Sequence, residues 1–530
     1  MPKETISYQE SGYFSKIVTD YLNRKSSLKD LYNLYPTIEN FNLQIQEKAK
    51  EFSSINRKIL TEELIHQYKI QNISKETLNN INLLKNQNTF TITTGHQLNL
   101  FTGPLYFIYK IVSVINLCKQ LKSYYANYNF VPVYWMATED HDFAEINNFE
   151  YNHKKLIWKS NTNGAVGSIS TNGLEDVYNI LQKLFPENNA SDYLKTLFKN
   201  SYLSNTNLAE ATRTLVNSLF SSEGLVIIDA NKKNLKQLFT NTIKKELLNQ
   251  TTFKCVNNTN ILLKDYETQV NAREINLFYL DENVRERIVY ENHNFRVLHT
   301  NLTFTEEEIL EILKNNPEKL SPNVLLRPLY QETILPNICY IGGGAEVAYW
   351  LQLKSTFAAN NITFPIILLR NSALIITKKQ QEKIEKLNLS LSELFLPKQE
   401  LINKKTKEYS SQNLDFTALK NHLHNQFKKL YDVANETGAS FLGALKAQEA
   451  KQIKGLEKLE KKLFNAEKKL HSDKLLRIIN LHNELFPNET LQERKVNFSE
   501  FYASYGNDFF SELYKNFNPL EHNFSIITLS

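Results

Sequence analysis

The chain has 530 residues, 42% of them hydrophobic, which is enough for a large core and two to four domains. Its net charge of +5 comes from 62 basic and 57 acidic residues, a near balance that gives no electrostatic case for binding nucleic acid. Three widely spaced cysteines, Cys118, Cys255 and Cys339, argue against a disulfide framework and favour the cytoplasm. The sequence also shows no metal-ligand spacing, no signal peptide and no apolar run of membrane length.

Residues 1–86 are predicted to form an N-terminal helical segment. Apolar positions recur there at helical spacing among mixed charges, for example from Ile38 to Ile70, and no strand pattern interrupts them. A β-branched and aromatic run, Thr89 to Thr93, then predicts a strand. After a loop, Pro104 to Tyr125 has helical spacing, and Pro104 suits a first helical turn. Val131 to Ala137 predicts a second strand.

The same order of strand and helix returns later in the chain. It is found in Gly224–Asp229 with a helix from about Lys233, in Ile338–Ile341 with a helix from about Ala345, and in the strand Phe364–Leu369. Continuous apolar strands that alternate with helices favour a parallel sheet covered on both faces, so we predict an α/β core. This core spans residues 87–372, with less regular insertions at about 150–220 and 251–320.

Residues 373–490 are predicted to form a helical coiled-coil domain. Its clearest pattern is a heptad seam in which apolar residues are spaced three and four apart, namely Leu456, Leu459, Leu463, Ala466 and Leu470. Two long antiparallel helices fit this composition, with a turn expected between Leu414 and Asn435. The C-terminal segment 491–530 ends in a predicted strand, Phe524 to Leu529, that returns to the core.

Glycine placement gives the first indication of a binding site. Five of only 14 glycines lie between a predicted strand and a predicted helix, namely Gly95, Gly103, Gly342, Gly343 and Gly344. In an open parallel sheet, ligands bind at the carboxyl ends of the strands, where glycine lets backbone N–H groups approach an anion. The alternative is that these glycines only form tight turns.

The segment TEDHD ends the second predicted strand with three acids and a histidine. Glu139, Asp140, His141 and Asp142 are a costly concentration of charge unless they meet a substrate, a cation or a proton. Asp140, His141 and Asp142 are candidates for orienting an amine or taking its proton. A solvated turn at the strand end is the alternative.

Other polar residues are expected along the same edge of the sheet. They are His96 and Gln97 in the first loop, Arg327, Gln331 and Glu332 in RPLYQE, Glu346, Tyr349 and Trp350 after the triple glycine, and Arg370 and Asn371 after the last strand. His96 is interpreted as a ligand contact, and Arg327 suits a carboxylate or phosphate. Glu346 either caps its helix or faces the ligand. Arg494 and Lys495 form a weaker candidate anion site, for which a solvated basic patch is the alternative.

Four long segments carry a resemblance to a known family. TGHQLNLFTGPLYFIYKI, VPVYWMATEDHDFAEIN, LLRPLYQETILPNICYIGGGAEVAYWLQLK and FPIILLRNS resemble the bacillithiol biosynthesis cysteine-adding enzyme family, and LQERKVNF and NPLEHNFSIITL extend the likeness over nearly the whole chain. The resemblance implies a Rossmann-type core with connecting-peptide-like insertions, and a coiled-coil domain that supports a homodimer. It implies a cytoplasmic ligase that joins the carboxyl group of cysteine to the amine of glucosaminyl-malate.

The family's core is similar to class I aminoacyl-tRNA synthetases, which carry His-x-Gly-His after the first strand. This chain keeps only Gly95-His96 of that motif. Amide formation needs an activated acyl group, a neutral amine and donors for the developing oxyanion. Arg327 is the expected carboxylate clamp, Asp140 or His141 the base, and the N–H groups of Gly95 and Gly342–Gly344 the donors.

We expect ATP or another adenine nucleotide as co-substrate, although no Walker loop is present. No metal site, nucleic-acid partner or membrane partner is expected. Two alternatives stay open at this point. One is another adenylate-forming or nucleotidyl-transfer enzyme on the same core that acts on a different amine, and the other is a non-enzymatic coiled-coil scaffold.

Overall fold

A computed structural model of the protein describes residues 4–69, 73–160, 163–437 and 439–529. The chain divides into two compact units. The first comprises Met1–Gln9, Tyr13–Ile375 and Gln492–Leu529, and the second comprises chiefly Ile376–Leu491. In the ranges that the structure describes, no helix combines the length and the apolar character needed to span a bilayer.

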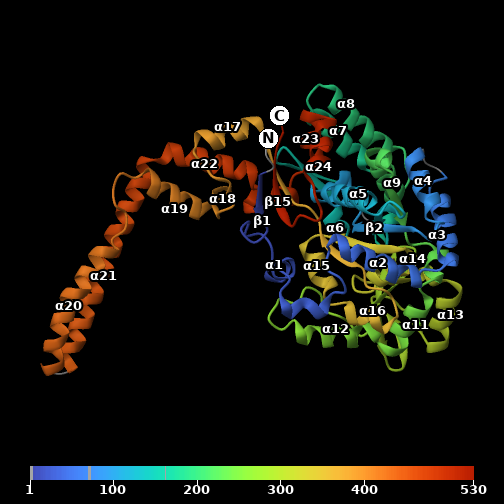
Figure 1. Ribbon diagram of the computed structural model, residues 1–530, viewed down its shortest axis with the longest axis horizontal. Helices are drawn as coiled ribbons and strands as arrows, with labels where there is room; N and C mark the ends of the chain where they lie inside the picture. Colours follow the sequence, from blue (N-terminus) through green and yellow to red (C-terminus); the bar gives the residue numbers. More distant parts are fainter. Residues whose placement is uncertain (1–3, 70–72, 161–162, 438, 530) are drawn as a thin grey trace. The chain divides into compact units, whose positions relative to one another are not determined.

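A five-stranded parallel sheet lies at the centre of the first unit (Figure 1). Its strands are β2 (Thr89–His96), β3 (Asn129–Met136), β6 (Val226–Asp229), β12 (Asn337–Gly342) and β13 (Ile366–Leu369), in the order β13-β12-β2-β3-β6. The five strands predicted for the core are confirmed, as is the α/β fold class. The direction in which strands are added reverses between β2 and β12, and such a switch point is where parallel sheets bind ligands.

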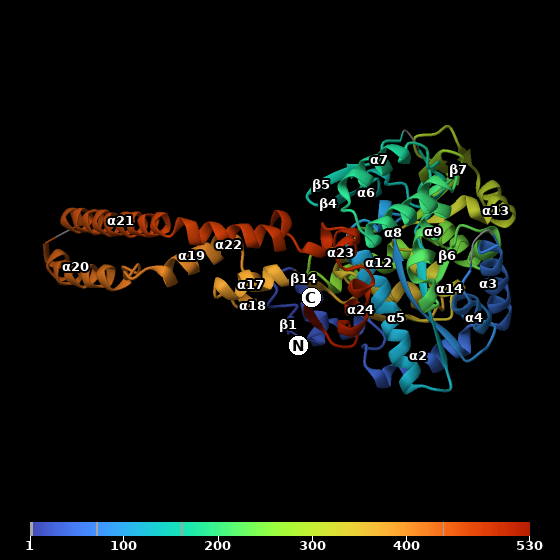
Figure 2. The same ribbon diagram turned by 90° about the horizontal axis from the view of Figure 1, so that it is seen from above.

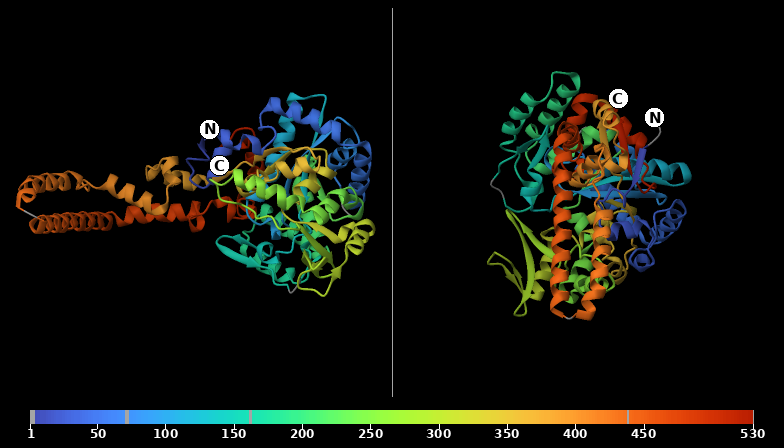
Figure 3. Two further views of the ribbon diagram at one scale, coloured as in Figure 1. Left: turned by 90° about the horizontal axis from the view of Figure 1, so that it is seen from below. Right: turned by 90° about the vertical axis from the view of Figure 1, so that its left-hand side faces the viewer.

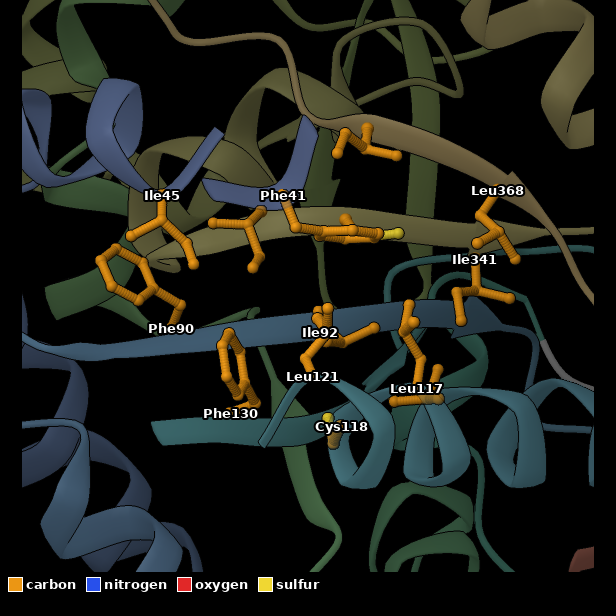
Figure 4. Packing of buried hydrophobic residues seen from close by; sticks show 14 residues of the cluster. Phe41, Ile45, Phe90, Ile92, Leu117, Cys118, Leu121, Phe130, Ile341 and Leu368 are labelled. Atoms are coloured by element: carbon orange, nitrogen blue, oxygen red, sulfur yellow. The ribbon is translucent and has the colours of Figure 1, made fainter. Parts of the chain in front are cut away.

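One face of this sheet is covered by α2 (Ile38–Glu51) and α5 (Tyr106–Tyr124). Figure 4 shows Phe41 of α2 and Leu117 of α5 packed with strand residues such as Ile92, all of them buried. Burying an apolar side chain of this size contributes about 1.5–3 kcal/mol, so this layer accounts for much of the stability of the core.

The remaining helices of the first unit surround the sheet and build the insertions. They are α1 (Lys16–Leu22), α3 (Ser54–Gln67), α4 (Lys75–Leu83), α6 (Phe143–Ile146), α7 (Leu174–Leu184), α8 (Asn189–Phe198), α9 (Leu208–Phe220), α10 (Lys233–Gln237), α11 (Thr240–Asn249), α12 (Thr251–Leu262), α13 (Glu306–Asn315), α14 (Arg327–Ile334), α15 (Gly344–Trp350), α16 (Lys354–Ala359), α23 (Phe498–Tyr505) and α24 (Asn507–Asn516). The predicted helices from about Lys233 and Ala345 are therefore present, the first of them split into α10 and α11.

The N-terminal segment differs from the prediction in two ways. Its long helical stretch breaks after α2, because the Ser53 hydroxyl accepts the N–H of Asn56 and starts α3 anew; Ile70, its predicted end, lies outside the described residues. The segment also contains a strand, β1 (Glu4–Ser7), where none was expected. This strand pairs with the far end of the chain, so its own residues gave no signal for it.

The helix after β2 begins two residues later than predicted. Pro104 is not in its first turn but forms an isolated bridge with Asn497, while Leu105 N–H donates to Val496 O over 2.9 Å. Pairing with the C-terminal segment therefore overrides the local preference of proline for a helix start.

Both predicted insertions contain regular structure. The first holds a hairpin of β4 (Asn148–Tyr151) and β5 (Lys154–Ile157) followed by α7–α9. The second holds α12, α13 and an antiparallel sheet, the insertion sheet, with strands in the order β10 (Thr303–Phe304), β9 (Asn294–Val297), β8 (Val284–Glu291), β7 (Leu277–Asp281) and β11 (Leu320–Pro322). The prediction of a less regular segment at 251–320 is wrong. Residues 285–287 of β8 are three consecutive charges, and the other four strands have only two to five residues, so the sequence pattern of each strand is weak.

The C-terminal segment of the first unit completes a small second sheet. The predicted final strand is confirmed as β15 (Asn523–Leu529), which lies between β1 and β14 (Ala373–Thr377) rather than in the parallel sheet. Glu493 anchors this segment: its Oε1 lies 2.6 Å from Arg370 Nη2, with both side chains buried. It also accepts hydrogen bonds from Ser372 Oγ and Ala373 N–H, each 3.3 Å long.

Apart from Ile376 and Thr377, which end β14, the regular structure described for the second unit is helical. Its helices are α17 (Lys378–Lys386), α18 (Leu391–Leu394), α19 (Lys398–Tyr409), α20 (Thr417–Thr437), α21 (Ala439–Leu470) and α22 (Ser472–Leu485). Figures 2 and 3 show α20 and α21 side by side as an antiparallel pair, which confirms the predicted helical hairpin. The predicted turn between Leu414 and Asn435 is wrong, because α20 is helical across most of that range.

The two helices of the hairpin do not pack against each other mainly through the predicted heptad seam. They pack through a cluster that includes Phe427 and Leu445. The seam residues Leu459 and Leu470 are 56% and 73% exposed in the single chain. Leu459, Ala466 and Leu470 are thus exposed on α21, while Leu456 and Leu463 of the same seam are half-buried.

We expect Glu493→Gln to lower the free energy of unfolding by about 3–5 kcal/mol, because it leaves the buried Arg370 guanidinium without a matching charge. Urea denaturation followed by circular dichroism would show the midpoint at lower urea. The control is Glu512→Gln, which removes the partly exposed pair with Lys515 and should cost less than about 1 kcal/mol. Equal midpoints for the two variants would contradict this role of Glu493.

Candidate functional site

A cavity of about 610 Å³ lies at the carboxyl ends of β2, β3 and β12, a size typical of sites for small molecules. It coincides with the switch point of the sheet. Nine of the residues predicted from the sequence line it: Gly95, His96, Gln97, Glu139, Asp140, His141, Arg327, Glu346 and Tyr349.

An ion pair between the buried Lys110 and the half-buried Glu346 crosses this end of the sheet. Lys110 Nζ, on α5, lies 2.5 Å from Glu346 Oε2 and donates to the carbonyl oxygen of Gly95 over 2.9 Å. Glu346 also accepts from Tyr340 Oη (2.6 Å) and from the N–H of Gly343 (2.8 Å). Burial raises the pKa of Glu346, but the charge of Lys110 and these donors outweigh it, so the pKa is lowered. Glu346 thus both caps α15 and lines the cavity as a carboxylate.

Arg327, at the start of α14, brings a positive charge into the cavity. Its Nη1 donates to Gln331 Oε1 over 2.9 Å, and its Nη2 donates to Tyr349 Oη over 3.3 Å. The guanidinium also faces the rings of Trp135 and Tyr340, at 5.8 and 5.4 Å from their centroids. In the part of the chain that the structure describes, no carboxylate forms an ion pair with it. A partly enclosed guanidinium held by neutral groups is suited to an anionic ligand.

Gly95 makes room for this guanidinium. A Cβ atom at position 95 would lie 3.2 Å from Tyr340 Oη and 3.5 Å from Arg327 Nη1. The glycine therefore lets the end of β2 lie directly against Arg327, and close packing rather than a turn accounts for it.

Gly103 shapes the first loop without lining the cavity. It follows Phe101 and Thr102, and all three residues have positive φ angles, between 47° and 68°. Asn497 Nδ2 donates to the carbonyl oxygens of Phe101 (2.7 Å) and Gly103 (2.6 Å), which holds the loop in this strained form.

Asp140 and His141 form a polar group with Arg285 of β8. Asp140 accepts from Gln97 Nε2 (2.9 Å) and from the His141 N–H (2.7 Å). Burial raises the pKa of Asp140, but these hydrogen bonds and the charge of Arg285 lower it to well below the usual range. Asp140 is therefore a stable anion and a weak proton acceptor.

The ring of His141 has a defined tautomer in this arrangement. Arg285 Nη1 lies 2.7 Å from His141 Nδ1, and a guanidinium only donates, so Nδ1 accepts and the proton resides on Nε2. The distance between Nδ1 and Asp140 Oδ1 is longer, at 3.5 Å, and an Nδ1 without a proton cannot donate to that carboxylate. Neither residue is a ready general base in this geometry.

Glu139 connects the core to the insertion sheet. Its carboxylate lies 2.8 Å from the buried Lys236 Nζ and 2.5 Å from Ser321 Oγ of β11. Asp142, the last residue of this polar turn, is exposed and directly precedes α6, outside the cavity lining.

His96 is buried between the rings of Tyr106 and Phe107. Burial, with the nearby charges of Lys110 and Arg370, lowers its pKa well below 6.5, so the ring is neutral. Its Nε2 has no hydrogen-bond partner among the described residues, although the side chain lines the cavity. A ligand group is therefore a suitable partner for this nitrogen.

The other predicted site residues lie outside the cavity lining. They are Gly103, Asp142, Gln331, Glu332, Gly342, Gly343, Gly344, Trp350, Arg370, Asn371, Arg494 and Lys495. Their side chains and N–H groups are mostly engaged elsewhere: the Gly343 N–H bonds Glu346, Arg370 pairs with Glu493, and Trp350 stacks on Tyr340 at 4.5 Å.

Gln331 and Glu332 point into the core behind Arg327. Gln331 Nε2 donates to Glu332 Oε1 (2.8 Å), as does Asn337 Nδ2 (2.7 Å). Lys48 Nζ lies 3.9 Å from Glu332 Oε2. Since Gln331 also accepts from Arg327, this buried network positions the guanidinium rather than contacting a ligand.

Sequence reasoning missed several residues of the lining. Lys110 sits in the apolar face of α5, where a lone charge in an apolar run was an available signal. Tyr340 is inside β12, and Arg273, Arg285 and Arg287 belong to the insertion that gave no strand signal. Over the described ranges, no group of three or more His, Cys, Asp and Glu side chains is arranged to hold a metal ion.

Two family models match the chain. Residues 1–371 match the bacillithiol biosynthesis BshC N-terminal Rossmann-like domain, and residues 373–529 match the BshC C-terminal coiled-coil domain. These matches confirm the predicted combination of a Rossmann-like core with a coiled coil.

Curated relatives carry the name "putative cysteine ligase BshC". One from Flavobacterium psychrophilum is 55% identical over 528 residues, covering 99% of each chain. One from Flavobacterium johnsoniae is 55% identical and covers 100% of each chain. One from Cytophaga hutchinsonii is 39% identical and covers 98% of each chain.

The buried Glu332 should make stability depend on pH. Burial raises its pKa to about 7, so the folded chain keeps the proton up to a higher pH than the unfolded chain, whose carboxyl ionises near 4.5. Between these two pH values the folded state binds more protons than the unfolded state. The stabilising contribution of Glu332 therefore falls as pH rises from about 4.5 to 7.

Glu332→Gln removes this contribution. From pH 5 to pH 8, we expect the difference in unfolding free energy between the variant and the natural chain to shift in favour of the variant by on the order of 2 kcal/mol. Urea midpoints measured at both pH values test this. If the difference between variant and natural chain is the same at both, Glu332 does not titrate as described.

Proposed function

Because the chain belongs to the BshC family of bacillithiol biosynthesis, we propose that it is a ligase that forms an amide between the carboxyl group of cysteine and the amine of glucosaminyl-malate. The observation that carries the proposal is Arg327, a guanidinium in the cavity without a carboxylate partner among the described residues. The name of the relatives, cysteine ligase, supports this class of reaction.

The cysteine carboxylate would bind Arg327, which presents a planar pair of N–H donors. Asp140, held as an anion, would orient the attacking amine in its ammonium form rather than act as a strong base. The ammonium proton would then pass to water, which leaves the neutral amine to attack the activated carbonyl carbon. The unpartnered Nε2 of His96 would contact a further polar group of the substrates. The three residues line one cavity, so both reactants would lie close together there.

A free carboxylate forms an amide only after activation, because its oxygen is a poor leaving group. We propose that ATP supplies this activation, with the carboxylate oxygen leaving as part of phosphate or of AMP. The switch point of a parallel sheet, where nucleotides bind in many proteins, supports this co-substrate. The three cysteines are free thiols, which supports a reaction in the cytoplasm.

The full chain incubated with cysteine, glucosaminyl-malate and ATP should yield the cysteinyl product, detected as a new thiol by mass spectrometry. Omitting ATP should abolish it, and chromatography of the nucleotides would show whether AMP or ADP is released. Absence of the thiol both with and without ATP would refute the proposal.

Arg327→Gln should raise KM for cysteine about 10- to 100-fold, because a charge-assisted hydrogen bond to a carboxylate is lost. KM for glucosaminyl-malate should change less than about twofold. The matched control is Tyr349→Phe, which removes one neutral contact to the same guanidinium and should have a much smaller effect. An unchanged KM for cysteine in Arg327→Gln would remove the clamp from the mechanism.

We also propose that the chain forms a homodimer through the apolar seam on α21. The exposure of Leu459 and Leu470, which the hairpin of one chain leaves uncovered, supports this. Leu459→Glu with Leu470→Glu should convert the dimer to a monomer, measured by light scattering after size exclusion. Lys462→Glu, an exposed change on the same helix, should leave the dimer intact. A natural chain that is monomeric, or a dimer that survives the double change, would exclude this seam.

A further inference from the structure

One face of the insertion sheet forms a wall of the cavity. Phe278 on β7 pairs with Arg287 on β8, and residues directly opposite each other, or two apart, share a face, so Arg285 lies on that face too. Ser321 of β11 stands opposite Phe278 on the same face, and its hydroxyl bonds Glu139 of the core. This face therefore points toward the carboxyl edge of the parallel sheet.

The arginines of this wall differ in their partners. Arg285 donates to His141 and lies close enough to Asp140 for the two charges to compensate. Arg287 and Arg273 also line the cavity. In the described ranges of the chain, neither of these two forms an ion pair with a carboxylate.

The charges lining the cavity show a surplus of cations. Every carboxylate that lines it has a cation beside it, in the combinations Glu346 with Lys110, Glu139 with Lys236, and Asp140 with Arg285. Among the described residues, Arg273 and Arg287 remain without such a partner. Arg327 is influenced by the charge of Glu346, which already pairs with Lys110. Since unmatched arginines in one cavity repel each other, a ligand that brings several negative charges would relieve this repulsion.

We propose that Arg273 and Arg287 form a dicarboxylate subsite that binds the two carboxylate groups of the amine substrate. The inference rests on the proposed function, in which Arg327 takes the single carboxylate of cysteine. A guanidinium pairs with one carboxylate through two parallel hydrogen bonds, so two arginines match two carboxylates.

This subsite would also select the amine substrate. A related amine with one carboxylate leaves one of the two arginines without a partner, which lowers its affinity. The parallel sheet would then supply the site of amide formation, and the insertion would decide which amine enters it.

The test compares two amine substrates of the full chain: glucosaminyl-malate and glucosaminyl-lactate, which lacks one carboxylate group. Arg287→Gln and Arg273→Gln should each raise KM for glucosaminyl-malate, by about 10- to 100-fold for the half-buried Arg287 and by less for the exposed Arg273. Both should leave KM for cysteine within twofold and shrink the preference for malate over lactate.

The matched control is Arg296→Gln. Arg296 lies on β9 of the same sheet, outside the cavity lining, and pairs with Glu291 at 3.1 Å. It should leave both KM values unchanged. If Arg287→Gln and Arg273→Gln also leave KM for glucosaminyl-malate within twofold, the subsite is refuted while the proposed function stands.

A second readout separates the subsite from the reaction. Calorimetry with free L-malate and L-lactate should show that the natural chain binds malate at least tenfold more tightly, and that Arg287→Gln loses this preference. If the natural chain makes no product, the proposed function fails, and this titration still decides the subsite. No preference for malate in the natural chain would overturn it.

Discussion

Lys110 carries its ammonium group to the carboxyl edge of the parallel sheet, where it meets the carboxylate of Glu346. Its helix follows β2 and the helix of Glu346 follows β12, so the ion pair joins the two elements that flank the switch point. A largely buried ion pair forms only where further hydrogen bonds offset the loss of water, and Tyr340, Gly343 and Gly95 provide them. The rest of the cavity is arranged around this pair.

Because Lys110 and Glu346 neutralise each other, Arg327 is left without an ion-pair partner among the described residues of the cavity lining. The neutral side chains of Gln331 and Tyr349 fix the orientation of Arg327 without cancelling its charge. Behind it, the buried polar network of Glu332 and Asn337 restricts Gln331 to one orientation. The proposed recognition of an anion by Arg327 would thus depend on Gln331, Glu332 and Asn337, which lie outside the cavity lining.

The sequence patterns correctly predicted those elements whose structure depends on residues close together in the chain. Continuous apolar runs defined the strands, and the rule that ligands bind at strand ends brought Gly95, Asp140 and Glu346 into the lining of one cavity. The patterns did not predict features that depend on contacts with residues far away in the chain. The strand β1 exists because β15 pairs with it, and Arg370 lies at a strand end but is taken by Glu493, far along the chain.

The insertion sheet shows a third kind of difficulty. β8 is eight residues long, but its three consecutive charges at 285–287 break the alternation of apolar and polar residues, so no strand was predicted and the charges could not be assigned to a face. Only the register with β7 shows that Arg285 and Arg287 share the face toward the cavity. The amino-acid sequence alone does not show which residues of two strands lie opposite each other.

The strained loop at Phe101–Gly103 can be fixed in its final conformation only after the C-terminal part of the chain has been synthesised. Two non-glycine residues there hold left-handed backbone conformations, each at a cost of about 1–2 kcal/mol. The amide that offsets this cost belongs to Asn497, which leaves the ribosome 394 residues after Gly103. A growing chain can therefore assemble its parallel sheet while this loop is still free to relax. The loop is fixed in its final form only when the last part of the polypeptide returns to it.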